Sequence, residues 1–488
     1  MSKRHLGQPH PFFCQVTFEY ISYNLPLILP FLALLDTSPQ ASELIKEDSI
    51  EPLATLFSSL AALDYRSKAM KYTTKILLVV LKKNDVFRNQ VVQHGTGKIL
   101  LDMLSISSIA DYTEDKLVSD SKEFLVTVEY AACCMLELLK NNIINPNGLW
   151  IYLDEKSNSE EEVDTAKCLV SARNRFEALL RNLIFLIQFG SVWGKEIAIL
   201  FITILLYDEY MKPIILASDI SSVLIAAMSE DCEESTRYSA ILAMSVLVYD
   251  KTTTRVHLID KGLLPSLVKA LSSLNTKTRR HAALCIQLLT SQTSLVPHLV
   301  CSGIVSELTT LLSSFTKLIG RSLPGTVECN DGCKIVEYTL LSLFNLFSES
   351  ENAKNEGSNF GIGRTLIEII GDTDTINTRI LENAIRALGA FAKRKKMCDY
   401  SLELIFGGAC QALCRCLTSS EHTLRLYSLL ALDVLLQNKI DDILDPMGDR
   451  LSGVEFKRKM KKSIEDIRVD TQFEVERKAA NELLRKLG

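Results

Sequence analysis

The strongest constraint in this sequence is a pattern written twice within residues 234–314. Thr236-Arg-Tyr-Ser-Ala-Ile-Leu recurs as Thr278-Arg-Arg-His-Ala-Ala-Leu, and Gly262-Leu-Leu-Pro-Ser-Leu recurs as Gly303-Ile-Val-Ser-Glu-Leu. The offsets are 278 − 236 = 42 and 303 − 262 = 41 residues. A period of about 40 residues with apolar positions at helical spacing predicts an all-α solenoid, in which each unit buries its apolar face against its neighbours.

Weaker copies of the pattern extend over most of the chain. They begin near residue 64 and recur at 335–372 and 376–419, each with a glycine-containing turn before an apolar helix. We predict an irregular N-terminal helical cap at 1–63, repeats at 64–444 with insertions at 154–164 and 315–334, and a charged C-terminal helix at 445–488. That last helix either caps the stack or serves as a partner-binding arm.

The two insertions have the composition of surface loops. Asp154–Asp164 holds six acidic residues and one lysine, and Phe315–Lys334 contains Pro324-Gly325 and Asn330-Asp-Gly332. Proline, glycine and asparagine at such positions are typical of turns, and a run of like charge favours solvent. We expect both segments to be loops that contribute to specificity.

Composition argues against several classes of protein. The net charge of −5 lacks the basic excess that a protein dominated by phosphate-backbone contacts needs, so it argues against nucleic-acid binding. The 13 cysteines are odd in number and lie mostly within apolar helical patterns, which favours reduced core thiols. We therefore expect a cytoplasmic protein that is also compatible with the nucleus.

Two apolar runs raise the question of a membrane segment. The run from Leu25 to Leu35 is interrupted by Pro26 and Pro30, and no cleavage pattern of small residues stands out beside it. Residues 197–206 form a run of ten, which is too short to span a bilayer and has the length of a buried helix. Both observations argue against a membrane partner.

No motif in the sequence predicts catalysis, a cofactor or a small-molecule substrate. A phosphate-binding loop and a nucleophile elbow are both absent from the sequence. Cys410, Cys414 and Cys416, with Cys398 and His422 nearby, could suggest zinc, but their spacing is not that of a common closed site. We interpret them as core cysteines and predict no metal. For Cys329 and Cys333, in the insertion, a redox pair or a metal-ligand role stays open.

The units at 236–274 and 278–314 resemble armadillo repeats, with their Ala-Ala-Leu type helix, a linker and then Gly-x-x-x-x-Leu. The resemblance implies an all-α, right-handed armadillo or HEAT-like α-solenoid superhelix. It also implies an interaction protein whose third helices line a groove that binds partner helices or extended segments.

Peptide-binding members of that family carry groove asparagines on their third helices. By the resemblance, only Asn345 and Asn182 match them, whereas apolar residues occupy the other matching positions: Leu242, Val246, Leu284, Leu288, Leu430 and Val434. The two tryptophans, Trp150 and Trp193, lie outside the recognisable third helices. We expect a groove that prefers an apolar helix or a few side-chain anchors to a long extended backbone, and this argues against a nuclear-import adaptor.

Two basic runs complete the candidate sites. They are Lys393-Arg394-Lys395-Lys396 and the run at 457–462, and each is compatible with solvated charge, a nuclear localisation signal, an anionic-lipid contact or a patch for an acidic partner. The predicted function is a non-enzymatic scaffold or adaptor for protein partners. The alternatives are a regulator of another protein, like a GTPase exchange factor or a co-chaperone, and a nuclear shuttle.

Overall fold

In a computed structural model, every regular element that is described is a helix. The described residues are 50–63, 68–83, 85–93, 95–105, 119–140, 165–208, 210–229, 231–250, 252–319, 327–372, 377–393, 400–436 and 450–487. The predicted cap up to residue 49 and the predicted acidic loop at 154–164 lie outside these ranges. The chain divides into two compact units, Met1–Val246 and Leu247–Gly488.

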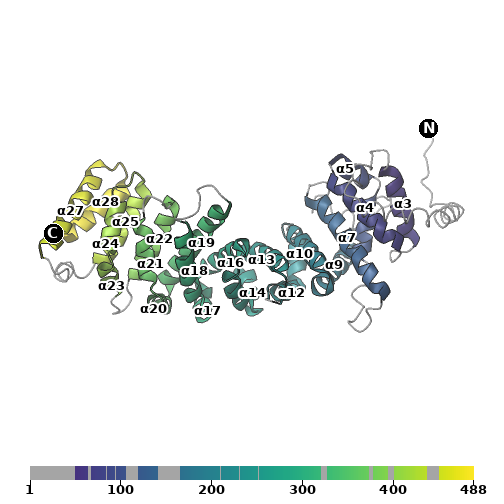
Figure 1. The fold of residues 1–488 in the computed structure, drawn as a ribbon, viewed down its shortest axis with the longest axis horizontal. Helices are drawn as coiled ribbons and strands as arrows, with labels where there is room; N and C mark the ends of the chain where they lie inside the picture. The colour runs from purple at the N-terminus through teal and green to yellow at the C-terminus, as the bar shows by residue number, and fades with distance from the viewer. Residues whose placement is uncertain are drawn as a thin grey trace. The chain divides into compact units, whose positions relative to one another are not determined.

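Nine of the helices that the structure describes lie wholly in the first unit, and the longest of them has 25 residues. They are α3 (Ile50–Leu63), α4 (Lys68–Lys83), α5 (Asp85–Gln93), α6 (Thr96–Ser105), α7 (Ser119–Lys140), α9 (Thr165–Phe189), α10 (Val192–Leu205), α11 (Met211–Ala217) and α12 (Ile220–Ala227) (Figure 1). The division falls within α13 (Glu234–Tyr249). Residues 197–206, predicted to form a buried helix, lie in α10 and at its C-cap, and most of them are buried.

The second unit shows the regular form of the repeat. Its helices are α14 (Thr252–Asp260), α15 (Leu263–Leu271), α16 (Thr276–Thr290), α17 (Val296–Cys301), α18 (Ile304–Ile319), α19 (Val327–Glu349), α20 (Glu351–Asn359), α21 (Ile362–Gly371), α22 (Thr378–Ala392), α23 (Tyr400–Phe406), α24 (Ala409–Cys416), α25 (His422–Leu436), α27 (Arg450–Asp470) and α28 (Glu474–Leu487). A short 3₁₀ turn, Thr293–Leu295, precedes α17. Each repeat has a short first helix, a second helix and a long third helix.

A glycine with positive φ separates the first helix from the second in each of these repeats. Gly262, Gly303, Gly361 and Gly408 have φ between 71° and 92°, and Gly95 holds the same place between α5 and α6. A residue with a Cβ rarely adopts this left-handed backbone conformation, whereas glycine adopts it without steric cost. The repeated glycine in the sequence therefore marks the turn at which the chain reverses within a repeat.

The third helices lie side by side in one row. Helices α16, α19, α22 and α25 contact one another in that order, and α19, α22 and α25 are adjacent in Figure 1. Their buried faces carry the core, which includes Ile286, Leu343 and Leu388. We call the surface that this row presents the third-helix row.

Polar groups at the helix ends are satisfied locally. The Asn275 side chain accepts from the backbone N–H groups of Lys277 and Thr278 at the start of α16, and Asn377 accepts from Arg379 N–H at the start of α22. Such N-caps each stabilise a helix by about 1 kcal/mol. The sequence thereby sets where these third helices begin.

A cation on the first helix reaches the end of a third helix in three repeats. Arg88 Nε on α5 donates to the Leu81 carbonyl of α4 at 2.6 Å, and Arg255 Nε on α14 donates to the Val248 carbonyl at 2.8 Å. Arg255 Nη1 also donates to Leu288 O of α16 at 3.0 Å.

The third case is Lys354 on α20, whose Nζ donates to the carbonyl of Lys393 directly after α22. Carbonyls in the last turn of a helix lack intrahelical donors, and a cation there also offsets the negative end of the helix dipole. Sequence analysis did not identify this device.

The predicted insertion at 315–334 is helical at both ends. Helix α18 runs through Ile319, and α19 begins at Val327 and includes the Asn330-Asp-Gly332 segment that we interpreted as a turn. The prediction of a loop over the whole stretch is therefore wrong. One reason is that Asp331 is buried and bonds to Arg280 of α16 at 2.7 Å, so tertiary packing overrides the local turn preference.

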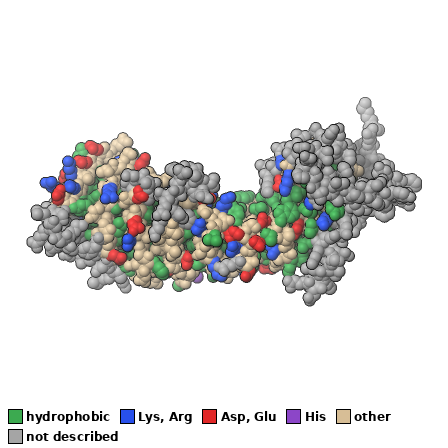
Figure 2. All heavy atoms as spheres, viewed as in Figure 1, with side chains coloured by type: hydrophobic (Ala, Val, Ile, Leu, Met, Phe, Trp, Pro, Cys, Tyr) green, Lys and Arg blue, Asp and Glu red, His purple; other side chains and the backbone are tan. Residues whose placement is uncertain are grey.

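The predicted single C-terminal helix is instead a pair of helices, α27 and α28, joined at residues 471–473. Helix α28 packs on α25, the last third helix. Figure 2 shows lysine, arginine, aspartate and glutamate side chains together over the two helices, where Arg458, Lys462, Glu482 and Arg485 are exposed. A polar outer face over a buried apolar one is what a terminal cap of a repeat stack requires.

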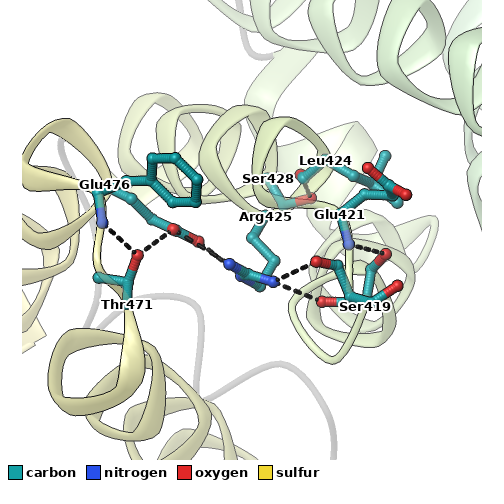
Figure 3. A network of polar contacts seen from close by, with 9 residues as sticks. Ser419, Glu421, Leu424, Arg425, Ser428, Thr471 and Glu476 are labelled. Carbon is teal, nitrogen blue, oxygen red and sulfur yellow. Dashed lines mark hydrogen bonds and ion pairs between the residues drawn. The ribbon is translucent and has the colours of Figure 1, made fainter.

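A buried ion pair fixes this terminal pair of helices to the last repeat (Figure 3). Arg425 Nε and Nη2 donate to the two carboxylate oxygens of Glu476 at 2.6 and 3.2 Å, while its Nη1 donates to the carbonyls of Ser419 and Ser420. The Thr471 hydroxyl donates to Glu476 Oε2 at 2.5 Å. Because Glu476 is 0% exposed, these contacts provide the compensation that its charge needs.

Candidate interaction surface

The structure places Asn182 inside the core of the first unit. Its side chain on α9 is 1% exposed, and its Nδ2 donates to the Leu104 carbonyl in the last turn of α6 at 2.7 Å. The amide thus satisfies a helix end that would otherwise be buried without a donor. The prediction that Asn182 contacts a partner is wrong.

Asn345 lies at the junction of two third helices. It is half-buried on α19, and its Nδ2 donates to the Thr290 hydroxyl at the end of α16 at 3.2 Å. This bond ties neighbouring repeats together. A contact between Asn345 and a partner remains a prediction.

The first basic run lies mostly outside the described residues. Lys393 is exposed, and its backbone carbonyl accepts from Lys354, whereas Arg394, Lys395 and Lys396 are not among the residues described. Their role as partner contacts remains a prediction. In the second run, the exposed Lys459 pairs with Glu455 one turn away on α27 at 3.0 Å.

Four of the six apolar residues that we expected to line the groove are at least partly exposed on third helices of the second unit. Leu284 and Leu288 on α16 and Val434 on α25 are half-buried, and Leu430 on α25 is 48% exposed. Residues next to them, such as Leu289, are fully buried. These third helices thus carry aliphatic side chains at positions that match the groove asparagines of peptide-binding armadillo proteins.

An aromatic–arginine ladder crosses three helices of this row. Phe344 lies on α19, Arg386 on α22 and Tyr427 on α25. The Arg386 Cζ atom lies 4.3 Å from the Phe344 ring centroid and 5.5 Å from the Tyr427 centroid. Both distances are within the range of cation–π contacts. The Arg386 guanidinium therefore links its own repeat to the repeat before it and the repeat after it.

The polar groups beside the ladder are satisfied within the protein. Glu382, one turn before Arg386 on α22, accepts from the Thr423 hydroxyl of α25. Arg379, at the start of α22, pairs with Glu337 of α19 at 2.6 Å. Arg386 itself is half-buried and has no hydrogen bond or ion pair within the part of the chain that the structure describes.

A further hollow of the second unit lies beside the terminal helices among the described residues. A pocket of about 300 Å³ is lined by Leu417, Thr418, Arg425, Ser463, Asp466, Ile467, Asp470 and Thr471. Arg425 at its edge is already engaged by Glu476. Because that arginine fixes the terminal helices, we assign the pocket to the packing of the cap.

The cysteines that could suggest zinc are mostly core residues. Cys410 and Cys416 are buried, and burial raises the pKa of Cys410 to about 12 and that of Cys416 to about 11. Burial, with the neighbouring Cys410 and Cys416, also raises the pKa of Cys414 to about 12. Within the described ranges no group of three or more His, Cys, Asp or Glu side chains is arranged to hold a metal ion. These thiols therefore stay protonated at neutral pH.

No single helix among those described is both long and apolar enough to cross a membrane. Thr276–Thr290 and Thr293–Cys301 pass that test only when they are taken together, and the chain bends by 104° between them.

We expect the second unit to lose stability as the pH falls from 6.5 towards 4. Burial, and to a lesser extent Arg280, lowers the pKa of His281 on α16 to about 4, while Asp331 acts in the opposite direction. An unfolded histidine binds a proton near pH 6.5, so between these values the unfolded state binds more protons than the folded state. The stabilisation is complete above pH 6.5 and is lost as the pH falls through 4.

The measurement is urea denaturation at pH 7 and pH 5, in the parent chain and in His281→Gln. Between pH 7 and pH 5, the free energy of unfolding of the parent should fall by on the order of 1–2 kcal/mol more than that of the variant. If both chains lose the same amount, His281 does not carry the effect.

Comparison with known proteins places the fold. No protein-family model matches the sequence, and no curated protein matches it. Among solved structures, an engineered protein is 15% identical over 90% of this chain and 98% of its own, with a TM-score of 0.57.

Two designed armadillo repeat proteins, one of them in complex with the peptide (KR)4, are each 16% identical. They cover 52% and 55% of this chain, and 98% and 99% of their own, with TM-scores of 0.43 and 0.42. The assignment rests on the engineered protein and on the repeat geometry described above. The chain is an all-α repeat protein with an armadillo-like fold.

Proposed function

We propose that this chain is a non-enzymatic interaction scaffold that binds a segment of a partner protein across the third-helix row of its second unit. The observation that carries the proposal is the aromatic–arginine ladder, where Arg386 is half-buried between two rings without a polar partner among the described residues. Arginine and tyrosine are the residue types that most often dominate binding at protein interfaces.

The surface favours side-chain anchors over a long extended backbone. An extended peptide needs repeated amide partners, but Asn182 is buried and Asn345 already donates to Thr290. The exposed Leu430 and the half-buried Leu284 and Leu288 offer apolar contacts instead. A partner helix with one apolar face, or a segment with a few anchoring side chains, fits this surface.

We also propose that the protein acts in the cytoplasm. The supporting observation is that the nine cysteines whose side chains the structure describes are free thiols. Five of them are buried: Cys133, Cys134, Cys285, Cys410 and Cys416. Buried free thiols are typical of a reducing compartment. Microscopy of the tagged full chain tests this, and a predominantly nuclear or secreted protein would contradict it.

Site-specific photo-crosslinking tests the scaffold function. We would replace Tyr427 with a photoreactive phenylalanine analogue in the full chain expressed in its native cells and identify the crosslinked proteins by mass spectrometry. The matched control places the same analogue at Phe360, which is exposed at the turn between α20 and α21 and is not part of a third helix.

We expect a partner that is crosslinked at Tyr427 and not at Phe360. The crosslink should weaken when Leu430 is changed to Ser, because that substitution removes an exposed apolar contact without emptying the core. Equal crosslinking at the two positions would contradict binding at the third-helix row.

A further inference from the structure

The N–H groups of Arg386 have no hydrogen-bond acceptor among the residues that the structure describes. The Phe344 ring centroid lies 4.3 Å from Cζ and the Tyr427 centroid lies 5.5 Å from it, and these rings come from the two repeats on either side. Aromatic rings attract a guanidinium without accepting its N–H groups in conventional hydrogen bonds, and the group has five such donors in a rigid fork. The rings therefore restrain the side chain without using its donors, which have no acceptor in the described part of the chain.

Arg386 differs from three other arginines of the third-helix row in its polar partners. Arg280 pairs with Asp331 at 2.7 Å, Arg379 with Glu337 at 2.6 Å, and Arg425 with Glu476 at 2.6 Å. Arg386 is the member of this set that lacks a carboxylate among the described residues. A fork already held in position loses less conformational freedom when an acceptor arrives, which favours binding.

We propose that Arg386 binds the carboxylate of an aspartate or glutamate side chain on the partner segment, with an apolar side chain of that segment against Leu430. This inference rests on the proposed function and names the chemistry of its partner. Two N–H···O bonds in parallel match the carboxylate geometry, and Leu430 lies on the next turn of α25 after Tyr427.

The local charge favours a carboxylate over a phosphorylated residue. Arg386 contributes one positive charge, and Glu382 lies one turn away on the same helix. The single positive charge of Arg386 matches the one negative charge of a carboxylate, whereas a phosphate group carries close to two at neutral pH and would keep one of them uncompensated next to Glu382. A single acidic residue therefore matches the site better.

The test begins with peptides selected from a random display library on the purified full chain. Selected peptides are synthesised with their acidic residue intact, with the matching amide, and with phosphoserine in its place. Their affinities for the parent chain, Arg386→Gln and Arg386→Lys are measured by fluorescence polarisation. Circular dichroism and thermal unfolding confirm that each variant is folded.

We expect the change from acid to amide to weaken binding to the parent chain by about tenfold or more, and to have little effect on binding to Arg386→Gln. Arg386→Lys should bind the acidic peptide more weakly than the parent, because lysine lacks the planar fork. An equal effect of the amide in the parent and in Arg386→Gln would overturn the inference. So would tighter binding of the phosphoserine peptide through Arg386.

Gly389 provides a second test on the protein side. A Cβ at Gly389 would lie 3.7 Å from the Ala431 Cβ, which is ordinary contact, so a Cβ is tolerated there, and thermal unfolding checks that the longer side chains leave the fold intact. Gly389→Glu places a carboxylate three residues after Arg386 on the same helix, within reach of it, and Gly389→Gln is the neutral control of equal size. We expect the Glu variant to bind the acidic peptide at least tenfold more weakly than the Gln variant.

The two proposals fail in different ways. If peptides are selected and bind at the third-helix row without dependence on Arg386, this inference fails and the proposed function stands. If no selected peptide or cellular partner crosslinks at Tyr427, the proposed function fails as well.

Discussion

Changing Arg425 to Ala is expected to destabilise the attachment of α27 and α28 to the last repeat by about 3–5 kcal/mol. The substitution removes both arginine donors to Glu476, which is 0% exposed and, among the residues that the structure describes, would keep only the Thr471 hydroxyl as a donor to its carboxylate. It also removes the bonds to the carbonyls of Ser419 and Ser420. A buried charge without compensation costs more free energy than the pair itself contributes.

Hydrogen exchange measured by mass spectrometry is the direct readout, since it reports opening of individual helices. Peptides from α27 and α28 should lose protection first. The matched control is Lys486→Ala, which breaks the partly exposed pair between Lys486 and Asp433 that joins α28 to α25. That loss should be below about 1 kcal/mol. Equal effects of the two substitutions would contradict the special role of the buried pair.

Changing Phe391 to Ala is expected to cost about 3–5 kcal/mol of unfolding free energy in the second unit. Phe391 on α22 is 2% exposed, and its ring centroid lies 5.1 Å from those of Phe347 on α19 and Tyr400 on α23. Removing the ring leaves a cavity between residues of three successive repeats and abolishes both aromatic contacts.

Urea denaturation followed by circular dichroism measures this effect. Phe391→Leu should lose less, because leucine fills part of the cavity. Phe360→Ala is the control at a position that is 54% exposed, and it should change stability by less than about 0.5 kcal/mol. Similar losses for Phe391→Ala and Phe360→Ala would show that the aromatic cluster is not a structural junction.

The repeat pattern predicted the fold well because local rules and tertiary packing agree there. Gly262 and Gly303 mark the turn in the sequence, and the structure shows positive φ at both and at Gly361 and Gly408. The insertion at 315–334 was mispredicted because its turn-like residues are held in helix α19 by a contact across repeats, from Asp331 to Arg280. Local turn chemistry does not report such a contact.

The candidate site was harder to predict for a related reason. Asn182 aligns, to within one residue, with the groove asparagine of peptide-binding armadillo proteins. In the structure its side chain on α9 is directed to the end of α6 and not to the surface. Arg386 was not singled out, because its meaning depends on residues in two other repeats. A signal was present: Phe344, Arg386 and Tyr427 are separated by 386 − 344 = 42 and 427 − 386 = 41 residues, the period of the repeat itself.

The cations on the first helices bear on how the chain is made. Arg255 contacts the end of α13, which precedes it, and the end of α16, which follows it, and Lys354 contacts the end of α22, which is translated later. During synthesis, Arg255 and Lys354 therefore leave the ribosome before the third helices whose ends they contact, α16 and α22. Helices α16 and α22 thus emerge after a first helix that supplies a donor for the carbonyls at their ends, which favours assembly of this part of the stack one repeat at a time from the N-terminal side.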